Sequence, residues 1–302
     1  MFQYETVENF LSGKTILVTG ASDGIGKCCA ETFASYGANV VLLGKNQEKL
    51  EAIYDKIEIL NPGKAIIQPL DFKIATEADY QNLSNSLAEQ FQKLDGLILN
   101  AGILGARSPI EFYPSDLWHE TIQVNVNSAF SLSKALLPNL KQSPDARIVF
   151  TSSSVGREGR AHWGAYAVSK FAIEGLMQTL AEELEKTSSI RVNSLNPGGT
   201  RTSMRKSAFP AEDPKTQPLP KELMPVYLYL LSEESKPIHG KAIDVRDFEP
   251  VNYLPKLSHL EYSSCRIQRK LYRFLKERNL LRTNFIRPKI ERTKGDVCKA
   301  TT

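Results

Sequence analysis

Apolar and polar positions follow two alternating patterns along this chain. Seven short runs are rich in Val, Ile and Leu, and the longer segments between them carry apolar residues at every third or fourth position. Continuous apolar runs are typical of strands buried on both faces, and a period near 3.6 is typical of helices. Strands are expected at residues 15–19, 39–43, 65–68, 96–100, 147–151, 190–195 and 241–245, and helices at residues 26–36, 47–60, 78–92, 116–137, 165–186 and 221–231. The alternation predicts an α/β fold, with a Rossmann-like, doubly wound sheet of seven parallel strands.

One segment between the last two strands fits neither pattern. Residues 200–220 include Pro210, Pro214, Pro218 and Pro220, and they predict a long loop. Long loops in compact domains often close over ligands. We expect the substrate to enter at this loop.

Length and charge divide the chain into two parts. Its 302 residues, 41% of them hydrophobic and 24% charged, have the composition of a globular protein. Since α/β folds of roughly 250 residues form single domains, we expect one domain at residues 1–248 and an extension at residues 249–302. The extension holds 13 Lys and Arg against 5 Asp and Glu, a net charge of +8, whereas residues 1–248 carry a net charge of −4. A basic amphipathic helix can bind a membrane, a nucleic acid or an acidic partner, but a solvated extension, partly helical or disordered, is the favoured interpretation.

Several classes of protein are not expected. No apolar run approaches the roughly 18 to 20 residues of a membrane span, and the first eleven residues are acidic where a secretion signal would be basic. The four cysteines form no CxxC pair and have no histidine at metal-ligand spacing. We therefore expect a cytoplasmic protein without a metal site. Nucleic acid is not an expected partner, because a net charge of +4 is small.

A glycine-rich turn follows the first expected strand and opens the first helix. Residues 19–26 are Thr-Gly-Ala-Ser-Asp-Gly-Ile-Gly. Glycines at such a turn let a pyrophosphate approach the helix N-terminus, although a plain strand-to-helix turn is the alternative. The candidate cofactor-binding residues here are Gly20, Ser22, Asp23, Gly24, Ile25 and Gly26.

The end of the second strand bears on the choice of cofactor. A carboxylate there would bond an adenosine ribose and repel a 2′-phosphate, but this chain has Gly44 followed by Lys45 and Asn46. Lys45 attracts a phosphate, which favours NADP(H) over NAD(H); a solvated lysine is the alternative. Further candidates follow the third and fourth strands: Asp71, Phe72, Asn100, Ala101 and Gly102. Asp71 either bonds the adenine or caps a turn.

Four other residues are candidates for catalysis. Tyr166 and Lys170 are four apart in an expected helix, so their side chains share one face. The neighbouring ammonium favours the phenolate and is expected to bring the pKa of Tyr166 closer to neutral pH. Ser153 follows the fifth strand, and its hydroxyl can share a bound carbonyl oxygen with Tyr166. Asn125 is either a satisfied buried amide or the mark of a helix kink that holds a water near Lys170.

Together these residues resemble the short-chain dehydrogenase/reductase family over roughly residues 12–246. The resemblance is carried, in order and spacing, by residues 19–26, residues 100–102, Asn125, Ser153, Tyr166, Lys170, Pro197, Gly198 and Thr202. More narrowly, residues 156–166 and 196–210 resemble the YciK-type oxidoreductases of proteobacteria.

The resemblance implies hydride transfer between the nicotinamide and a carbonyl or secondary alcohol. It implies that Tyr166 is the general acid/base, that Ser153 orients the oxygen, and that Lys170 holds the nicotinamide ribose and lowers the pKa of the tyrosine. Asn125 would support a water-linked proton relay. Thr200 and Thr202, after Pro197 and Gly198, would hold the carboxamide. The family also suggests a homo-oligomer, a dimer or tetramer, in which the helix bearing Tyr166 packs on its symmetry mate.

A second hypothesis is an NADP(H)-binding sensor or scaffold whose basic extension contacts a partner. The presence of both Tyr166 and Lys170 favours the enzyme, because a mere binder would not need them. The substrate is expected to be a small carbonyl or alcohol compound, bound between residues 200–220 and the residues around Leu104, His162 and Trp163.

Overall fold

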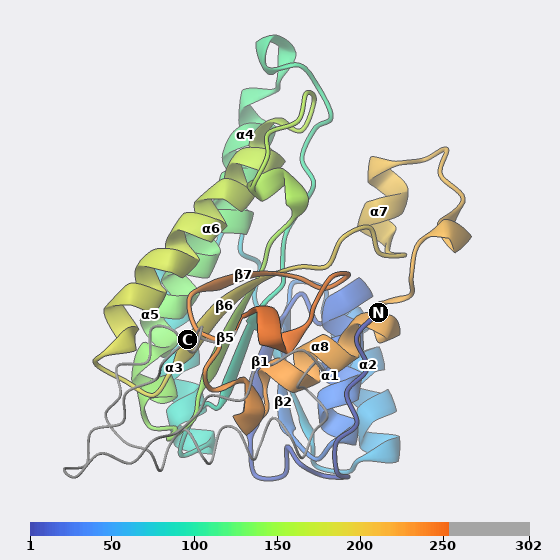
Figure 1. Ribbon diagram of the computed structural model, residues 1–302. Coiled ribbons are helices and arrows are strands. Elements are labelled where there is room, and N and C mark those ends of the chain that lie inside the picture. The colour runs from blue at the N-terminus through green and yellow to red at the C-terminus, as the bar shows by residue number, and fades with distance from the viewer. Residues whose placement is uncertain (254–302) are drawn as a thin grey trace, which may run out of the picture. The chain divides into compact units, whose positions relative to one another are not determined.

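The computed structural model describes residues 1–253 (Figure 1). The chain divides into two compact units, Met1–Phe248 and Glu249–Thr302. The helix predicted within the basic extension lies outside the described residues. In the described part of the chain, no helix is both long and apolar enough to span a membrane. The same part contains no group of three His, Cys, Asp or Glu side chains placed to hold a metal ion.

The seven predicted strands are confirmed, each to within one residue at either end. They are β1 (Thr15–Thr19), β2 (Asn39–Gly44), β3 (Ala65–Pro69), β4 (Gly96–Leu99), β5 (Arg147–Thr151), β6 (Arg191–Asn196) and β7 (Lys241–Asp244). All of them are parallel and form one sheet in the order β3-β2-β1-β4-β5-β6-β7. The Rossmann-like, doubly wound fold is therefore confirmed.

The helices agree with the prediction except at two places. They are α1 (Gly24–Ser35), α2 (Gln47–Leu60), α3 (Glu77–Gln90), α4 (Ser115–Ile122), α5 (Ser128–Lys141), α6 (Gly164–Glu185), α7 (Ser203–Ala208) and α8 (Met224–Leu230). The single helix expected at residues 116–137 is wrong, because a π-helical turn at Gln123–Asn127 separates α4 from α5. The loop expected at residues 200–220 contains α7, which Thr202 caps and which ends before Pro210.

The order of the strands reverses at β1. From β1 the chain moves outward to β2 and β3 and then returns to the other side of β1 to form β4. Leu17 of β1 consequently pairs with Val41 on one side and with Leu97 on the other. The loops that follow β1 and β4 leave the sheet in opposite directions, which opens a crevice at the carboxyl ends of the strands.

Helices cover both faces of the sheet and make it rigid. In Figure 1, α3, α5 and α6 lie on one face, and α1, α2 and α8 lie on the other. Leu17 and Leu97 are fully buried in a core that also includes Leu132 of α5 and Met177 of α6. Burying one such side chain contributes about 1.5–3 kcal/mol relative to leaving it exposed. The loops that carry the site therefore begin at the edge of a well-packed sheet.

Candidate active site

Three glycines shape the turn after β1. Gly20 and Gly24 have φ angles of +64° and +55°, in the left-handed region that residues with a Cβ atom rarely adopt. A Cβ atom on Gly26 would lie 2.3 Å from the carbonyl oxygen of Gly20. Asp23 caps α1 by accepting a hydrogen bond from the Gly24 N–H at 2.7 Å. Only glycine permits a turn this tight, and it leaves the start of α1 facing the crevice.

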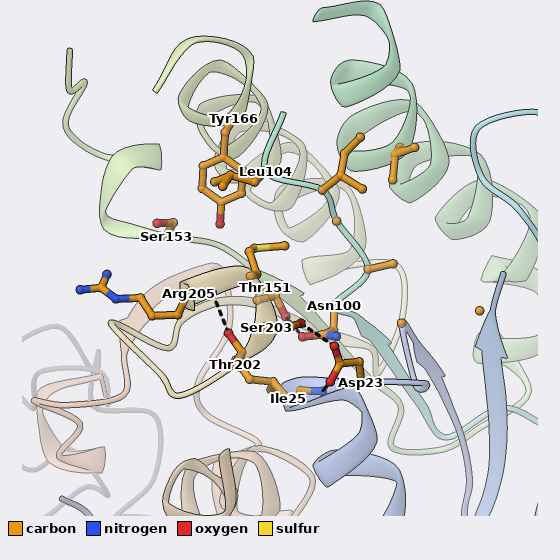
Figure 2. A pocket seen from close by; sticks show the side chains of 18 of the residues that line it. Asp23, Ile25, Asn100, Leu104, Thr151, Ser153, Tyr166, Thr202, Ser203 and Arg205 are labelled. Carbon is orange, nitrogen blue, oxygen red and sulfur yellow. Dashed lines mark hydrogen bonds between the residues drawn. The ribbon is translucent and has the colours of Figure 1, made fainter. Parts of the chain in front are cut away.

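The crevice is a cleft of about 480 Å³, a volume typical of small-ligand sites. Figure 2 shows Asp23 and Ile25 at one end of it, with Tyr166 and Ser153 at the other. The sequence-predicted residues that line it are Gly20, Ser22, Asp23, Gly24, Ile25, Lys45, Asn46, Asp71, Phe72, Asn100, Ala101, Gly102, Ser153, Tyr166, Lys170, Pro197, Gly198, Thr200 and Thr202. Gly26 and Asn125 are buried and are not part of this lining.

The wall of the cleft that follows β2 is cationic. Gly44 ends β2, so no carboxylate occupies this position, and the exposed Lys45 comes next. Lys49, in the first turn of α2, also lines the cleft and was not predicted. Lys73 lines the same region, but its ammonium lies 3.0 Å from the Glu120 carboxylate. Lys45 and Lys49 therefore give this end of the cleft a positive charge.

Two predicted residues at this end have local structural partners. The Asn46 side chain caps α2 by accepting a hydrogen bond from the Lys49 N–H at 2.9 Å. The Asp71 carboxylate accepts one from the Lys73 N–H at 3.0 Å, which is the turn-capping alternative. Phe72 is only 6% exposed and belongs mainly to the core. Each still presents part of its surface to the cleft.

Asn100 ties the ends of two neighbouring strands together. Its backbone N–H donates to the Thr19 hydroxyl at 2.9 Å, and its side-chain amide donates to the Thr19 carbonyl at 3.2 Å. The Ala101 N–H donates to the same hydroxyl at 2.9 Å. These bonds hold β4 against β1 where the strand order reverses, so the floor of the cleft is braced.

Tyr166 and Lys170 lie on the face of α6 that borders the cleft. The Lys170 ammonium nitrogen is 5.5 Å from the centre of the Tyr166 ring, and it donates a hydrogen bond to the Thr151 carbonyl at 2.7 Å. Tyr166 is 9% exposed and Lys170 4%. In Figure 2 the hydroxyls of Tyr166 and Ser153 lie side by side at one end of the cleft. The structure thus brings together three residues that the sequence separates by up to 17 positions.

Burial dominates the acid–base properties of both groups. It raises the pKa of Tyr166 to about 12, and a hydrogen bond with Ser153 opposes the rise. It lowers the pKa of Lys170 to about 8, against the attraction of Glu174. The expectation that the pKa of Tyr166 is brought closer to neutral pH is therefore wrong for the protein alone. Desolvation penalises the phenolate more than the hydrogen bond with Ser153 stabilises it.

A partly buried ionic network lies behind Lys170. Glu174, one helical turn further along α6, accepts hydrogen bonds from Ser194 at 2.7 Å and from Arg157 at 3.3 Å. Arg157 also pairs with Asp244, and Asp244 accepts a hydrogen bond from Asn196 at 2.6 Å. The network connects α6 to the ends of β6 and β7. Sequence reasoning missed it because its members lie far apart in the chain.

Asn125 has all its polar groups satisfied within the protein. Its carbonyl accepts from the Ile103 N–H at 2.8 Å, and its amide donates to the Ile103 carbonyl and the Ser169 hydroxyl, each at 3.0 Å. It lies in the π-helical turn, as the kink hypothesis requires. A cavity of about 10 Å³ between Asn125 and Lys170 has room for about one water molecule. The satisfied amide and the helix distortion, which were alternatives for Asn125, therefore occur together.

Helix α7 covers the cleft from the side opposite α6. The Ser203 hydroxyl donates to the Asp23 carboxylate at 2.5 Å, which links α7 to the glycine turn. Arg205 forms two hydrogen bonds with Glu212, of 2.7 and 2.6 Å. Thr200 is buried and donates weakly to backbone carbonyls at 3.4 Å. Because α7 was not predicted, the residues that it contributes to the lining were not predicted either.

Of the residues expected around the substrate, some line the corresponding end of the cleft and one does not. Leu104 and Trp163 line it, whereas His162 is exposed and does not. Further lining residues here are Met204, Arg205, Ala208 and Phe209. Their only signal in the sequence was their position within the proline-rich segment.

Fold and site together define a family. Residues 14–213 match the family described as short chain dehydrogenase. The chain belongs to the short-chain dehydrogenase/reductase family of NAD(P)-dependent oxidoreductases.

Its relatives confirm the narrower resemblance. The uncharacterized oxidoreductase YciK of Escherichia coli K12 is 46% identical over 243 residues, which cover 80% of this chain and 96% of YciK. A short chain dehydrogenase structure from Pseudomonas syringae is 49% identical, with a TM-score of 0.79 over 81% of this chain and 99% of that one. Another, from Shigella flexneri 2a and complexed with NADP, is 46% identical, with a TM-score of 0.78 over 80% of this chain and 100% of that one.

Proposed function

We propose that this protein is an NADP(H)-dependent oxidoreductase that interconverts a carbonyl compound and its alcohol, with Tyr166 as the general acid/base. The observation that carries the proposal is the convergence of Tyr166, Ser153 and Lys170 on one end of the cleft whose other end is the glycine turn. A binding protein would have no use for a buried phenol and ammonium at the inner end of its site.

The cleft fits a nicotinamide dinucleotide. Gly20 and Gly26 lack the Cβ atoms that would crowd this turn, so the turn packs tightly against the start of α1. A pyrophosphate is stabilised at such a helix N-terminus. When bound, the cofactor supplies or accepts the hydride. Lys170 would hold the nicotinamide ribose, and Thr200 and Thr202 would hold the carboxamide. The complex of the Shigella relative with NADP supports a nicotinamide dinucleotide as the ligand of the cleft.

The phosphate-bearing cofactor is favoured by charge. Lys45 and Lys49 line the end of the cleft next to β2, and Gly44 stands where a carboxylate would repel a 2′-phosphate. A charge-assisted bond to a phosphate is roughly twice as strong as a neutral hydrogen bond. We therefore propose a preference for NADP(H) over NAD(H).

We assign the proton transfer to side chains of the protein itself. In reduction, the Tyr166 hydroxyl transfers its proton to the carbonyl oxygen as hydride reaches the carbon, and the Ser153 hydroxyl donates a hydrogen bond to the same oxygen. The tyrosinate that remains is stabilised by the Lys170 ammonium, 5.5 Å from the ring centre. The cavity between Lys170 and Asn125 supports a water-linked path that returns a proton to Tyr166.

Activity measurements test the proposal. NADPH and NADH absorbance are followed with a panel of aldehydes, ketones, quinones and 3-oxoacyl thioesters, and Tyr166→Phe is the control. We expect turnover with one chemical class and its loss, by at least about 100-fold, in the variant, because general acid catalysis contributes about 10²–10⁴-fold. Undiminished turnover by Tyr166→Phe contradicts the proposed role. Tight NADPH binding without any turnover favours the sensor.

We also propose that the protein is a homo-oligomer. Phe130 of α5 and Val168 and Phe171 of α6 are 52%, 44% and 45% exposed, and they present an apolar surface on two long helices. A second copy of the chain would bury this surface through a symmetric contact. Light scattering should give a dimer or tetramer, and Phe171→Glu should reduce its mass; a monomeric wild type contradicts the proposal.

A cytoplasmic location is proposed as well. Cys28 and Cys29 are free thiols, and Cys29 is fully buried. Free adjacent thiols are consistent with a reducing compartment. Cell fractionation with an antibody to the chain would test the location.

A further inference from the structure

The substrate end of the cleft has an aromatic wall. Trp163 and Phe209 are 5.8 Å apart between ring centres, and Trp163 is 5.7 Å from the Tyr166 ring. Val155, Trp163, Tyr166 and Ala167 form a separate buried apolar cluster. The apolar residues packed against that cluster are Leu104, Met204, Ala208 and Phe209. This wall therefore surrounds the one phenol that we assign to proton transfer.

Two guanidinium groups hold the wall in place. Arg107 lies over the Trp163 ring at 4.1 Å and over the Phe209 ring at 5.4 Å, and it donates to the Ala208 carbonyl at 3.0 Å. Arg205 lies over the Phe209 ring at 3.8 Å. Cation–π contacts of this kind contribute about 0.5–2 kcal/mol each, so the rings are fixed before a ligand binds.

The backbone on both sides of Trp163 has positive φ angles. His162 has a φ angle of +67°, in the left-handed region. Gly164 has a φ angle of +35°, and a Cβ atom there would lie 2.2 Å from the Tyr113 ring. Unfavourable backbone conformations persist where the surrounding structure enforces them, often at ligand sites. Here they flank Trp163 and keep its ring in the wall.

The charge that α7 adds to the lining of this end of the cleft is paired. Arg205 is the only charged residue among the lining residues that α7 contributes, and both of its hydrogen bonds to Glu212 are short. Figure 2 shows its side chain pointing away from Tyr166. The hydroxyls of Tyr166 and Ser153 lie beside the wall, and under the proposed function both bond the same substrate oxygen.

We propose that this end of the cleft selects uncharged ketones and secondary alcohols in which a flat ring adjoins the reacting carbon. The inference rests on the proposed function and specifies its substrate class. A flat ring gains stacking or edge contacts with Trp163 and Phe209 that a flexible chain does not. A carboxylate on that ring would lose its hydration, because the cation that α7 adds to the lining, Arg205, is already paired with Glu212, and Arg107 lies outside the lining.

Binding without turnover provides the test. The full-length protein saturated with NADP⁺ is titrated with acetophenone, 2-octanone and 4-acetylbenzoate, and dissociation constants are measured by ligand-observed NMR. Acetophenone and 2-octanone have equal numbers of carbon atoms, and the chain compound is the more apolar of the two. We expect acetophenone to bind at least about fivefold more tightly than either competitor, since each aromatic contact contributes about 2- to 12-fold.

Variants link the preference to the wall. Trp163→Leu and Phe209→Leu should each reduce the preference for acetophenone over 2-octanone by about 2- to 12-fold. Phe112→Leu is the matched control, because Phe112 is 69% exposed and lies outside the cleft. The NADP⁺ affinity and the melting temperature of each variant show that it is folded.

The outcomes separate the two proposals. Equal or reversed affinities for acetophenone and 2-octanone, tighter binding of 4-acetylbenzoate, no saturable binding of acetophenone, or a preference that survives both wall variants overturns the specificity inference. Because no hydride is transferred in this experiment, such a failure is independent of whether Tyr166-dependent turnover is observed in the activity panel.

Discussion

Glu174 controls the charge of Lys170, and Glu174→Gln tests that control. Glu174 is 6% exposed and is bonded to Ser194 and Arg157. Burial brings the pKa of Lys170 down to about 8, and the Glu174 carboxylate is the group that opposes the fall. Without that carboxylate, Lys170 should lose its proton at a lower pH.

The size of the effect follows from the geometry of α6. Side chains one helical turn apart are roughly 6 Å from each other, and unit charges at that distance interact by about 3 kcal/mol at an effective dielectric constant near 20. The Arg157 guanidinium beside Glu174 offsets part of this energy. A net loss of about 1.4 kcal/mol corresponds to a fall of about 1 in the pKa of Lys170. At pH 8 the cationic fraction would then drop from about one half to about one tenth.

The assay is the pH dependence of kcat/KM for NADPH, which reports groups of the free enzyme. If the ammonium is required, activity is lost as the pH rises through the pKa of Lys170, about 8 in the wild type. For Glu174→Gln we expect that midpoint near pH 7, about one unit lower. The matched control is Glu183→Gln, which removes an exposed charge from the same helix and should leave the midpoint unchanged.

Two results would refute this reasoning. One is a midpoint that is the same in the wild type and in Glu174→Gln, and the other is a midpoint that moves upward. Thermal unfolding accompanies the assay, because a weakened bond to Ser194 or Arg157 is expected to cost about 1–3 kcal/mol. A folded variant with an unmoved profile would show that Glu174 has only a structural role.

Three further predictions concern the cofactor site and stability. Lys45→Ala should weaken NADPH binding about 3- to 10-fold more than NADH binding in fluorescence titrations, and an unchanged ratio contradicts the phosphate role. Gly26→Ala should destabilise the fold by about 1–3 kcal/mol, since its Cβ would overlap the Gly20 carbonyl; Gly159→Ala, with nothing within 4 Å, should not, and equal melting temperatures would refute the argument. The pKa of Lys170 is about 8 in the folded protein and 10.5 in the reference state, so between those pH values the unfolded chain binds more protons and stability rises with pH, by up to about 3 kcal/mol. Lys170→Met should flatten that rise in denaturant titrations, and an identical slope would contradict it.

Strand positions were predictable because they depend on a local property. A parallel strand covered by helices is typically a continuous apolar run, and β1, β2, β4 and β5 each contain one. The helix ends were less predictable. Helix α5 continues through Pro138 to Lys141, whereas the expected helix ended at residue 137.

The errors at α7 and at the π-helical turn have one cause. The prolines of residues 200–220 lie outside Ser203–Ala208, and this short helix is stabilised by the Thr202 cap and by the contacts of Ser203 and Arg205 with Asp23 and Glu212. The π-helical turn places Asn125 against Ile103 and Ser169. Contacts between residues so far apart in the chain produce no periodic pattern in the sequence.

The family, the glycine turn, Tyr166 and Lys170 could all be identified before folding was considered, because spacing within a turn or a helix is a local quantity. The electrostatics and the shape of the site, in contrast, arise from tertiary contacts. Folding buried both Tyr166 and Lys170, which raises the pKa of Tyr166 to about 12, against the expected direction, and lowers the pKa of Lys170 to about 8. It also packed Trp163 against Phe209, 46 positions away in the chain. Desolvation and ring packing depend on which segments meet in space, and that is settled only when the whole chain is folded.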